Sequence, residues 1–300
     1  MRFVTFESEA GPRAGVLVLV DGGERVLDLA HRSLVDCLAG TPADLLAMIE
    51  AGLSDICRRM PDPDMLPDDA VLPLESVRLL APLPSPPRIV GAAHNYRCAV
   101  AERGLNSPDA PVLFEKLQRT VVGSGSPVVL PAGAGGVTYE AELAVVIGKR
   151  AHRVSPDAAM DHVAGYTLFN DVSASEIIKA DGNFERGKNF STFGPMGPWL
   201  ATPDAFDPAG EHRITLSIDG DRQQDGSISD LIFGIADLIS RISQDAPLAP
   251  GTVIATGTPA GVAAMKTPPS WLKAGSVMTV EIEGLGRLTN PIMGEDTIHG

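Results

Sequence analysis

The chain has 300 residues, 44% of them hydrophobic, and a formal net charge of −14. This length supports one large domain or a large and a small one, and the acidic charge argues against nucleic acid or an anionic membrane as partner. Three cysteines without a C-x-x-C spacing argue against a disulfide framework or a zinc site. Because the N-terminus lacks a signal-peptide core and no stretch is long enough to span a bilayer, we expect a soluble, cytoplasmic protein.

Residues 1–83 predict a small N-terminal α/β module. Thr41, followed by a proline, predicts the N-cap of one helix that continues to about Arg59. Short apolar runs bounded by turn residues precede this helix and are typical of a β-meander: residues 3–6, 15–20 and 25–29.

The proline-rich segment 82–87 separates this module from the rest of the chain. Such a density of proline forbids a helix and disfavours a central strand. We therefore place a domain boundary near residue 83 and expect a larger domain over residues 84–300.

Strands dominate the elements predicted in the larger domain. The content of Gly (31) and Pro (25) suits a β-rich fold with many turns. Helices are predicted over residues 95–104 and 229–242, and the Gly/Pro-rich segment 188–199 is predicted to be a loop. Apolar, β-rich runs predict strands in the following places: residues 88–91, 111–116, 139–147, 165–171, 214–218, 277–282 and 287–292, and residues 253–261 predict a strand that runs into a tight turn.

Glu140 and Glu142 lie two residues apart in the predicted strand 139–147. Side chains at this spacing on a strand point the same way, so the two carboxylates are held side by side next to an apolar segment. Partly shielded like charges need a counter-charge, and a hard divalent cation is the natural partner, Mg²⁺ first, with Mn²⁺ or Ca²⁺ behind it. Asp171, at the end of the predicted strand 165–171, offers a third oxygen ligand. A solvated strand edge or a turn residue is the alternative for each residue alone, but the combination favours a metal site.

Four segments carry a further signal: residues 139–144 (YEAELA), 169–174 (FNDVSA), 187–198 (GKNFSTFGPMGP) and 255–262 (ATGTPAGV). In this order they resemble the fumarylacetoacetate hydrolase family, and the resemblance covers about residues 83–293. It implies an α+β, β-rich fold, a mixed β-sandwich roll, that is usually a homodimer and binds Mg²⁺ or Mn²⁺.

The resemblance also implies an enzyme that acts on 2-oxo acids or 1,3-diketo acids. We expect a C–C hydrolase of the acylpyruvate type first, with a 2-oxo acid decarboxylase or an enol–keto isomerase as alternatives. The family's metal ligands map onto Glu140, Glu142 and Asp171, where the cation would act as a Lewis acid toward the substrate. Lys188 matches a family lysine close to the substrate, and its ammonium could stabilise developing negative charge. A solvated loop lysine is the alternative for this residue.

Further candidates come from two loops. Tyr96 and Glu102 match the family pattern Asn-Tyr-x-x-His-x-x-Glu, in which the His and Glu activate water. The resemblance therefore implies that Glu102 carries proton transfer and that Tyr96 binds the substrate. Gly257 and Thr258 would offer hydrogen-bond donors to a substrate carboxylate, with plain turn chemistry as the alternative. His94 could act on the substrate from nearby, although a structural or surface histidine is the more common role.

The chain departs from the family pattern at the expected histidine, which is Ala99, and at two substrate-binding positions, which are Ser175 and Ile178 instead of Arg and Gln. Alanine cannot accept a proton, and losing a general base typically removes about 10²–10⁴ in rate. The missing histidine strengthens decarboxylation and tautomerisation as alternatives to hydrolysis, which stays the first expectation. The replacements at Ser175 and Ile178 predict a less polar, uncharged distal end of the substrate. A family scaffold that binds without catalysis is a further alternative, but the intact ligands and lysine favour an enzyme.

Overall fold

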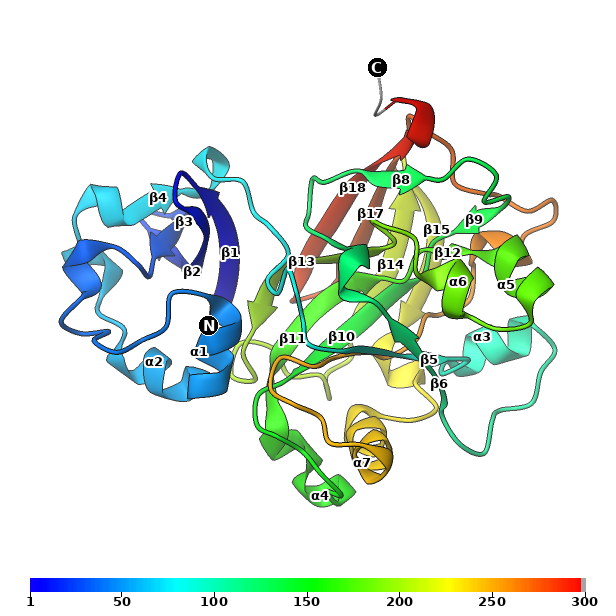
Figure 1. Cartoon of the computed structure of the whole chain (residues 1–300), viewed down its shortest axis with the longest axis horizontal. Coiled ribbons are helices and arrows are strands. Elements are labelled where there is room, and N and C mark those ends of the chain that lie inside the picture. The colour runs from blue at the N-terminus through cyan, green and yellow to red at the C-terminus, as the bar shows by residue number, and fades with distance from the viewer. Residues whose placement is uncertain (298–300) are drawn as a thin grey trace.

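The computed structural model describes residues 1–297 and confirms an α+β, β-rich architecture (Figure 1). Its main element is an 11-stranded mixed sheet. In spatial order the strands are β4 (Val71–Pro73), β3 (Gly23–Asp28), β2 (Gly11–Val20), β1 (Arg2–Ser8), β13 (Gly194–Ala201), β11 (Val163–Asn170), β10 (Ala141–Ile147), β16 (Val253–Ala255), β5 (Ile89–Ala93) and β6 (Val112–Lys116), with β7 (Val121–Val122) beside β13.

A second, five-stranded sheet packs on the central part of the first. Its order is β15 (Asp221–Ser227), β14 (Arg213–Ile218), β17 (Val277–Ile282), β18 (Gly286–Gly294) and β8 (Val128–Leu130). Leu143 and Val145 of β10 share one apolar core with Leu216 and Val280 of this sheet. Ala144 and Val146, on the opposite face of β10, join a second core with residues of the N-terminal module. Both faces of β10 are therefore buried, which explains its continuous apolar sequence.

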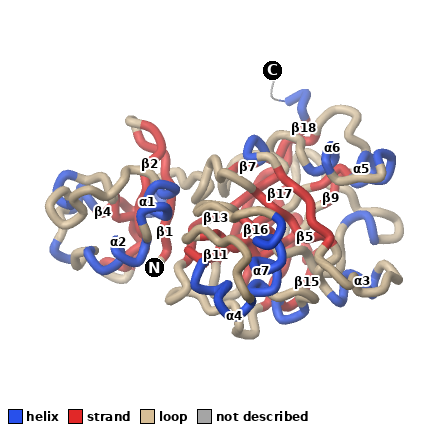
Figure 2. The backbone as a smooth tube through the Cα atoms, turned by 60° about the horizontal axis from the view of Figure 1, so that its bottom comes forward, coloured by secondary structure: helices blue, strands red, loops and turns tan. Residues whose placement is uncertain are grey.

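The N-terminal module forms one end of the molecule (Figures 1 and 2). Its three predicted strands are confirmed as β1, β2 and β3. Strand β1 also pairs with β13, with Arg2 opposite Ala201. The large sheet is thus continuous across residue 83, and the division into two domains at that residue stays a prediction.

The single helix predicted over residues 41–59 is wrong in two respects. It is two helices, α1 (Leu45–Ala51) and α2 (Leu53–Arg59), because Gly52 between them has φ +101°. A positive φ interrupts the helical hydrogen bonds and favours glycine. The N-cap is Asp44 instead of Thr41, since the Asp44 carboxylate accepts a 2.9 Å hydrogen bond from the Ala47 amide.

The remaining α-helices surround the sheets (Figure 2). They are α3 (Arg97–Glu102), α4 (Pro156–Ala159), α5 (Ser175–Asp181), α6 (Glu185–Lys188) and α7 (Ile235–Asp245). The helix predicted over residues 229–242 therefore begins later, at Ile235. Helices α3, α5 and α6 gather at the end of the molecule opposite the N-terminal module (Figures 1 and 2).

The loop predicted over residues 188–199 is wrong for its second half, which is strand β13. This strand pairs with β1, β7 and β11, so its backbone groups are satisfied despite its glycines and prolines. Gly194 is required there because a Cβ atom would lie 2.6 Å from the Thr120 hydroxyl. Within residues 1–297, no helix has the length and apolar character needed to cross a membrane.

Candidate active site

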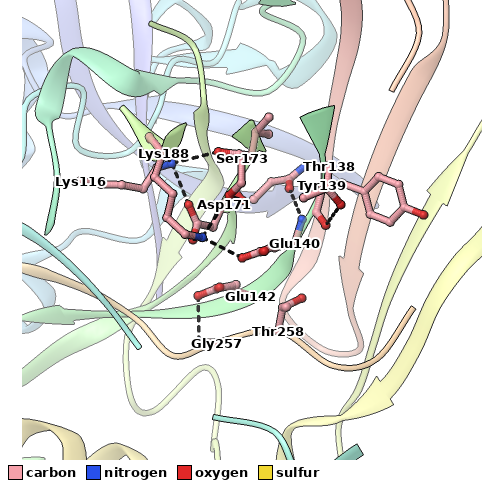
Figure 3. Close-up of polar contacts among 12 residues, drawn as sticks. Lys116, Thr138, Tyr139, Glu140, Glu142, Asp171, Ser173, Lys188, Gly257 and Thr258 are labelled. Carbon is pink, nitrogen blue, oxygen red and sulfur yellow. Dashed lines mark hydrogen bonds and ion pairs between the residues drawn. The ribbon is translucent and has the colours of Figure 1, made fainter. Parts of the chain in front are cut away.

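The start of β10 and the end of β11 bring three carboxylates together. These strands pair antiparallel, with Ala141 opposite Asn170. Glu140 therefore lies beside Asp171, and the Asp171 amide donates a 2.9 Å hydrogen bond to the Glu140 carbonyl. Carboxylate oxygens of Glu140, Glu142 and Asp171 lie within 4.8 Å of one another (Figure 3). The convergence predicted from strand alternation and the strand-end aspartate is thus present in the structure.

Two buried lysines complete this cluster. The Lys188 ammonium contacts Asp171 and lies 3.0 Å from both a Glu140 carboxylate oxygen and the Ser173 hydroxyl (Figure 3). Lys116, at the end of β6, places its Nζ 2.7 Å from the other Asp171 carboxylate oxygen, and both side chains are fully buried. Lys116 also donates to the Lys188 carbonyl at 2.6 Å. The sequence assigned no role to Lys116, and its only signal was a lysine closing an apolar strand.

Burial sets the charge state of the cluster. It raises the pKa of Glu142 well above the usual range, and the charges of Asp171 and Glu140 add to this rise. Burial also raises the pKa of Glu140, although Lys188 opposes it. For Asp171, burial again acts upward, but Lys116 and Lys188 outweigh it and lower the pKa. When all three carboxylates are ionised, as a bound cation would favour, their negative charge exceeds the positive charge of the two lysines. The cluster then offers the oxygen donors and the unmet negative charge that suit a hard divalent cation.

The turn after β16 orients Glu142. The Gly257 amide donates a 2.8 Å hydrogen bond to a Glu142 carboxylate oxygen. Gly257 has φ +101°, and a Cβ atom there would lie 2.8 Å from the Ala92 carbonyl oxygen. The Thr258 hydroxyl donates to the Ala141 carbonyl at 2.9 Å and accepts from Gln224 at 2.8 Å. Since both donors are used within the protein, substrate binding by Gly257 and Thr258 stays a prediction.

A cavity of about 290 Å³ opens beside the carboxylates. Acidic, basic and apolar side chains from five segments meet in it, and Lys188 is among them. Its walls are formed by Ala92, Ala93, His94, Arg103, Glu140, Glu142, Ser173, Ser175, Ile178, Phe184, Lys188, Thr258, Ala264 and Met265.

The family model described as fumarylacetoacetate (FAA) hydrolase C-terminal matches residues 88–293. The chain belongs to this family. An oxaloacetate tautomerase of Xenopus laevis is 35% identical over 297 residues, covering 98% of this chain and 90% of that protein. A protein of Burkholderia cenocepacia named as a putative hydrolase is 37% identical over 290 residues, covering 95% of this chain and 96% of its own length.

Solved structures of the family agree with the fold. A fumarylacetoacetate hydrolase from Exiguobacterium antarcticum superposes with a TM-score of 0.82 and 32% identity, covering 98% of this chain and 100% of that one. A 2-hydroxyhepta-2,4-diene-1,7-dioate isomerase from Mycobacterium marinum gives 0.76 and 31%, covering 98% and 99%. The family inferred from the four sequence segments is confirmed. The relatives are named as a tautomerase, an isomerase and hydrolases, which supports an enzyme without selecting one reaction.

The water-activating pair of the family pattern is not assembled at this cavity. Ala99, at the family's histidine position, is buried in the core on α3. Glu102 is exposed, and its carboxylate accepts hydrogen bonds of 3.1 and 3.2 Å from the Gly261 amide. Tyr96 is fully buried, and within residues 1–297 its hydroxyl has no hydrogen-bond partner. Neither Glu102 nor Tyr96 lines the cavity, so their predicted roles as catalytic and substrate-binding residues gain no geometric support.

His94 is the titratable cavity residue outside the carboxylate–lysine cluster that is suited to proton transfer near neutral pH. Its backbone has φ +56° at the exit of β5, which turns the chain toward α3. Burial lowers the pKa of His94, and the charges of Arg103 and Lys188 lower it further. The imidazole is therefore neutral at pH 7, the state that can accept a proton.

Proposed function

We propose that this protein is a divalent-metal-dependent enzyme that interconverts the enol and keto forms of a 2-oxo acid. The buried cluster of Glu140, Glu142 and Asp171 at the edge of a cavity is the observation that carries the proposal. The oxaloacetate tautomerase of Xenopus laevis and the isomerase of Mycobacterium marinum support this reaction class.

The three carboxylates would hold Mg²⁺ or Mn²⁺, which supplies Lewis acidity toward the oxygens of a 2-oxo acid. Lys188 contributes a fixed positive charge beside that site. Burial acts to lower the pKa of Lys188, but the charges of Asp171 and Glu140 raise it overall, so the ammonium stays protonated. Its hydrogens are engaged by Glu140, Asp171 and Ser173. Lys188 therefore stabilises developing enolate charge through its field and is not a base.

His94 is the group that we assign to proton transfer, in place of the predicted Glu102. A neutral imidazole on the cavity wall can accept the proton that leaves the carbon next to the keto group, and return one in the reverse direction. Glu102 is exposed and bound to the Gly261 amide, which keeps its carboxylate away from the cavity.

C–C hydrolysis, which the sequence favoured first, is the second candidate function. The Burkholderia cenocepacia protein and the Exiguobacterium antarcticum enzyme carry hydrolase names. Hydrolysis needs an activated water, and neither Ala99 nor Glu102 can activate one at the cavity in this arrangement. Decarboxylation would use the same carboxylates and Lys188, and it remains an alternative.

We also propose a homodimer that uses the edge strand β6. This strand is the last one of the large sheet. Its apolar residues Val112 and Leu113 are 36% exposed, and Leu117 just beyond it is 42% exposed. Unpaired strand edges with apolar side chains favour association, and light scattering that gives a monomer mass would contradict the dimer. Cytoplasmic location stays a prediction, and the Xenopus laevis relative is named as mitochondrial.

Oxaloacetate is the first substrate to assay, with the ultraviolet absorbance of its enol as readout. We expect tautomerisation with Mg²⁺ or Mn²⁺, loss of activity after chelation with EDTA, and recovery when the metal is restored. Glu142→Gln should abolish the activity, whereas Glu283→Gln, which changes an exposed turn residue, should leave it intact. A rate that is indifferent to EDTA and to Glu142→Gln would overturn the proposal.

A further inference from the structure

Arg103 presents a guanidinium group to the cavity without a carboxylate partner. It follows α3, where its backbone caps the helix, and its side chain is half-buried in the cavity wall. Within residues 1–297 the guanidinium forms no ion pair, and its one side-chain contact is to His94 Nδ1 at 3.4 Å. That length is near the limit of a hydrogen bond, and at least four of the five donors of the group remain available for a ligand.

Arg103 and His94 lie side by side in the cavity wall. The other cavity cation, Lys188, is already neutralised by Glu140 and Asp171. In a chain with a net charge of −14, an unpaired cation on a cavity wall is a local positive focus for an anionic ligand.

The charges of the whole site fit a dianion better than a monoanion. With all three carboxylates ionised around a divalent cation, the carboxylates, the two lysines and the cation would together carry one positive charge. Arg103 adds a second positive charge. One carboxylate of a substrate offsets the first, and a second carboxylate at the far end of the substrate offsets the other.

Arg103 also changes what the sequence suggested about the far end of the substrate. Ser175 and Ile178, which stand where the family pattern has Arg and Gln, predicted an uncharged distal group. Both line the same cavity as Arg103. The structure therefore supplies a guanidinium to this cavity from the end of α3, whereas α5 contributes Ser175 and Ile178.

We propose that Arg103 is a specificity-determining residue that binds the distal carboxylate of a dicarboxylic 2-oxo acid, the class to which the oxaloacetate of the assay above belongs. A guanidinium can accept a carboxylate through two parallel hydrogen bonds, which gives both affinity and orientation. This inference rests on the proposed function, because the 2-oxo acid end must lie at Glu140, Glu142 and Asp171. Arg103 then selects the substrate by its distal group from within the same cavity.

Two acids of equal length test the proposal, since they differ only in the distal group. 2-Oxoglutarate carries a carboxylate there and 2-oxopentanoate carries a methyl group. We would measure the Kd of each by calorimetric titration into the full chain with saturating Mg²⁺, for the wild type, Arg103→Gln and Arg103→Lys. Arg97→Gln is the matched control, because Arg97 lies on the same helix, is exposed and does not line the cavity.

We expect the wild type and Arg97→Gln to prefer the dicarboxylate by about ten-fold to a hundred-fold, the range of charge-assisted hydrogen bonds. Arg103→Gln should remove that preference by weakening only the dicarboxylate, and Arg103→Lys should restore part of it. Equal binding of both acids by the wild type, or equal weakening of both in Arg103→Gln, would overturn the role of Arg103 while the proposed function stands. Failure of both acids to bind the wild type would overturn the proposed function, and this inference with it.

Discussion

Replacing Asp171 by asparagine should strongly destabilise the metal-free protein. Asp171 is the shared partner of two buried lysines. Lys188 keeps Glu140 as a counter-charge in the variant, but Lys116 forms no other ion pair within residues 1–297. Asparagine has nearly the same shape, so the change removes charge with little change in packing.

The size of this loss in unfolding free energy depends on whether Lys116 stays charged without its partner. Removing one partner of a buried ion pair typically costs about 3–5 kcal/mol. Burial already lowers the pKa of Lys116, more than Asp171 raises it. The lysine can therefore escape the penalty by losing its proton, which from an ordinary pKa of about 10.4 costs about 4.6 kcal/mol at pH 7. This value is a ceiling, so we expect a loss of about 3–4.6 kcal/mol.

Urea denaturation in EDTA, followed by circular dichroism, measures this loss. Asp225→Asn is the control, because its pair with Arg213 is about half exposed and should be worth less than about 1 kcal/mol. The low pKa of Asp171 means that its stabilisation is complete above its unfolded pKa of about 4 and declines as the pH falls through the folded value. An Asp171→Asn loss no larger than that of the control at pH 7 would refute the reasoning.

Three further predictions concern the cavity. Because the pKa of Glu142 is raised, Mg²⁺ binding should displace a proton from this carboxyl group wherever it is still protonated, so the affinity for Mg²⁺ should rise with pH. Calorimetry in buffers of different ionisation enthalpy measures the released proton, and a binding heat that does not depend on the buffer would contradict the prediction. Gly257→Ala should destabilise the protein by about 1–3 kcal/mol and weaken Mg²⁺ binding, because the φ of +101° at this position strains alanine. An unchanged melting temperature would contradict this prediction. His94→Gln should lower kcat by about 10²–10⁴ while the Kd for a 2-oxo acid changes little, and an unchanged kcat in stopped-flow assays would exclude His94 as the proton carrier.

The carboxylate cluster could be predicted from the sequence because local rules place it. Glu140 and Glu142 are two residues apart at the start of an apolar strand, and Asp171 directly follows the next long one. The pairing of β10 with β11 then brings these ends together. Only Glu142 lies within β10 itself, and Glu140 directly precedes the first residue of this strand. The alternation of side chains between the two faces of the strand nevertheless extends to Glu140.

Lys116 could not be predicted because its partner is distant in both the chain and the sheet. Strand β6 lies at the far edge of the sheet, three strands away from β10, and it exposes two apolar residues while it buries its lysine. Val112 and Leu113 are exposed while Lys116 is buried. Hydrophobic patterning assumes apolar residues inside, so it fails where an ion pair is the core contact.

Two errors in the secondary structure arose from glycine and proline. Gly52 breaks a helix whose apolar spacing continues across it, since one positive φ outweighs periodicity. In β13 the glycines and prolines predicted a loop, but the segment is a strand. Gly194 fits there because it packs closely against Thr120, where a side chain would clash. The pairing of β13 with β1, β7 and β11 is a tertiary contact, which a single sequence does not show.

Manganese-soaked crystals provide the most direct test of the metal site on which the proposed function depends. Anomalous scattering locates Mn²⁺ without any assumption about the reaction. The account predicts one strong peak per chain, at about 2.0–2.2 Å from oxygens of Glu140, Glu142 and Asp171, and no such peak in crystals of Glu142→Gln. A peak elsewhere in the chain, or none at this cluster in the wild type, would contradict it.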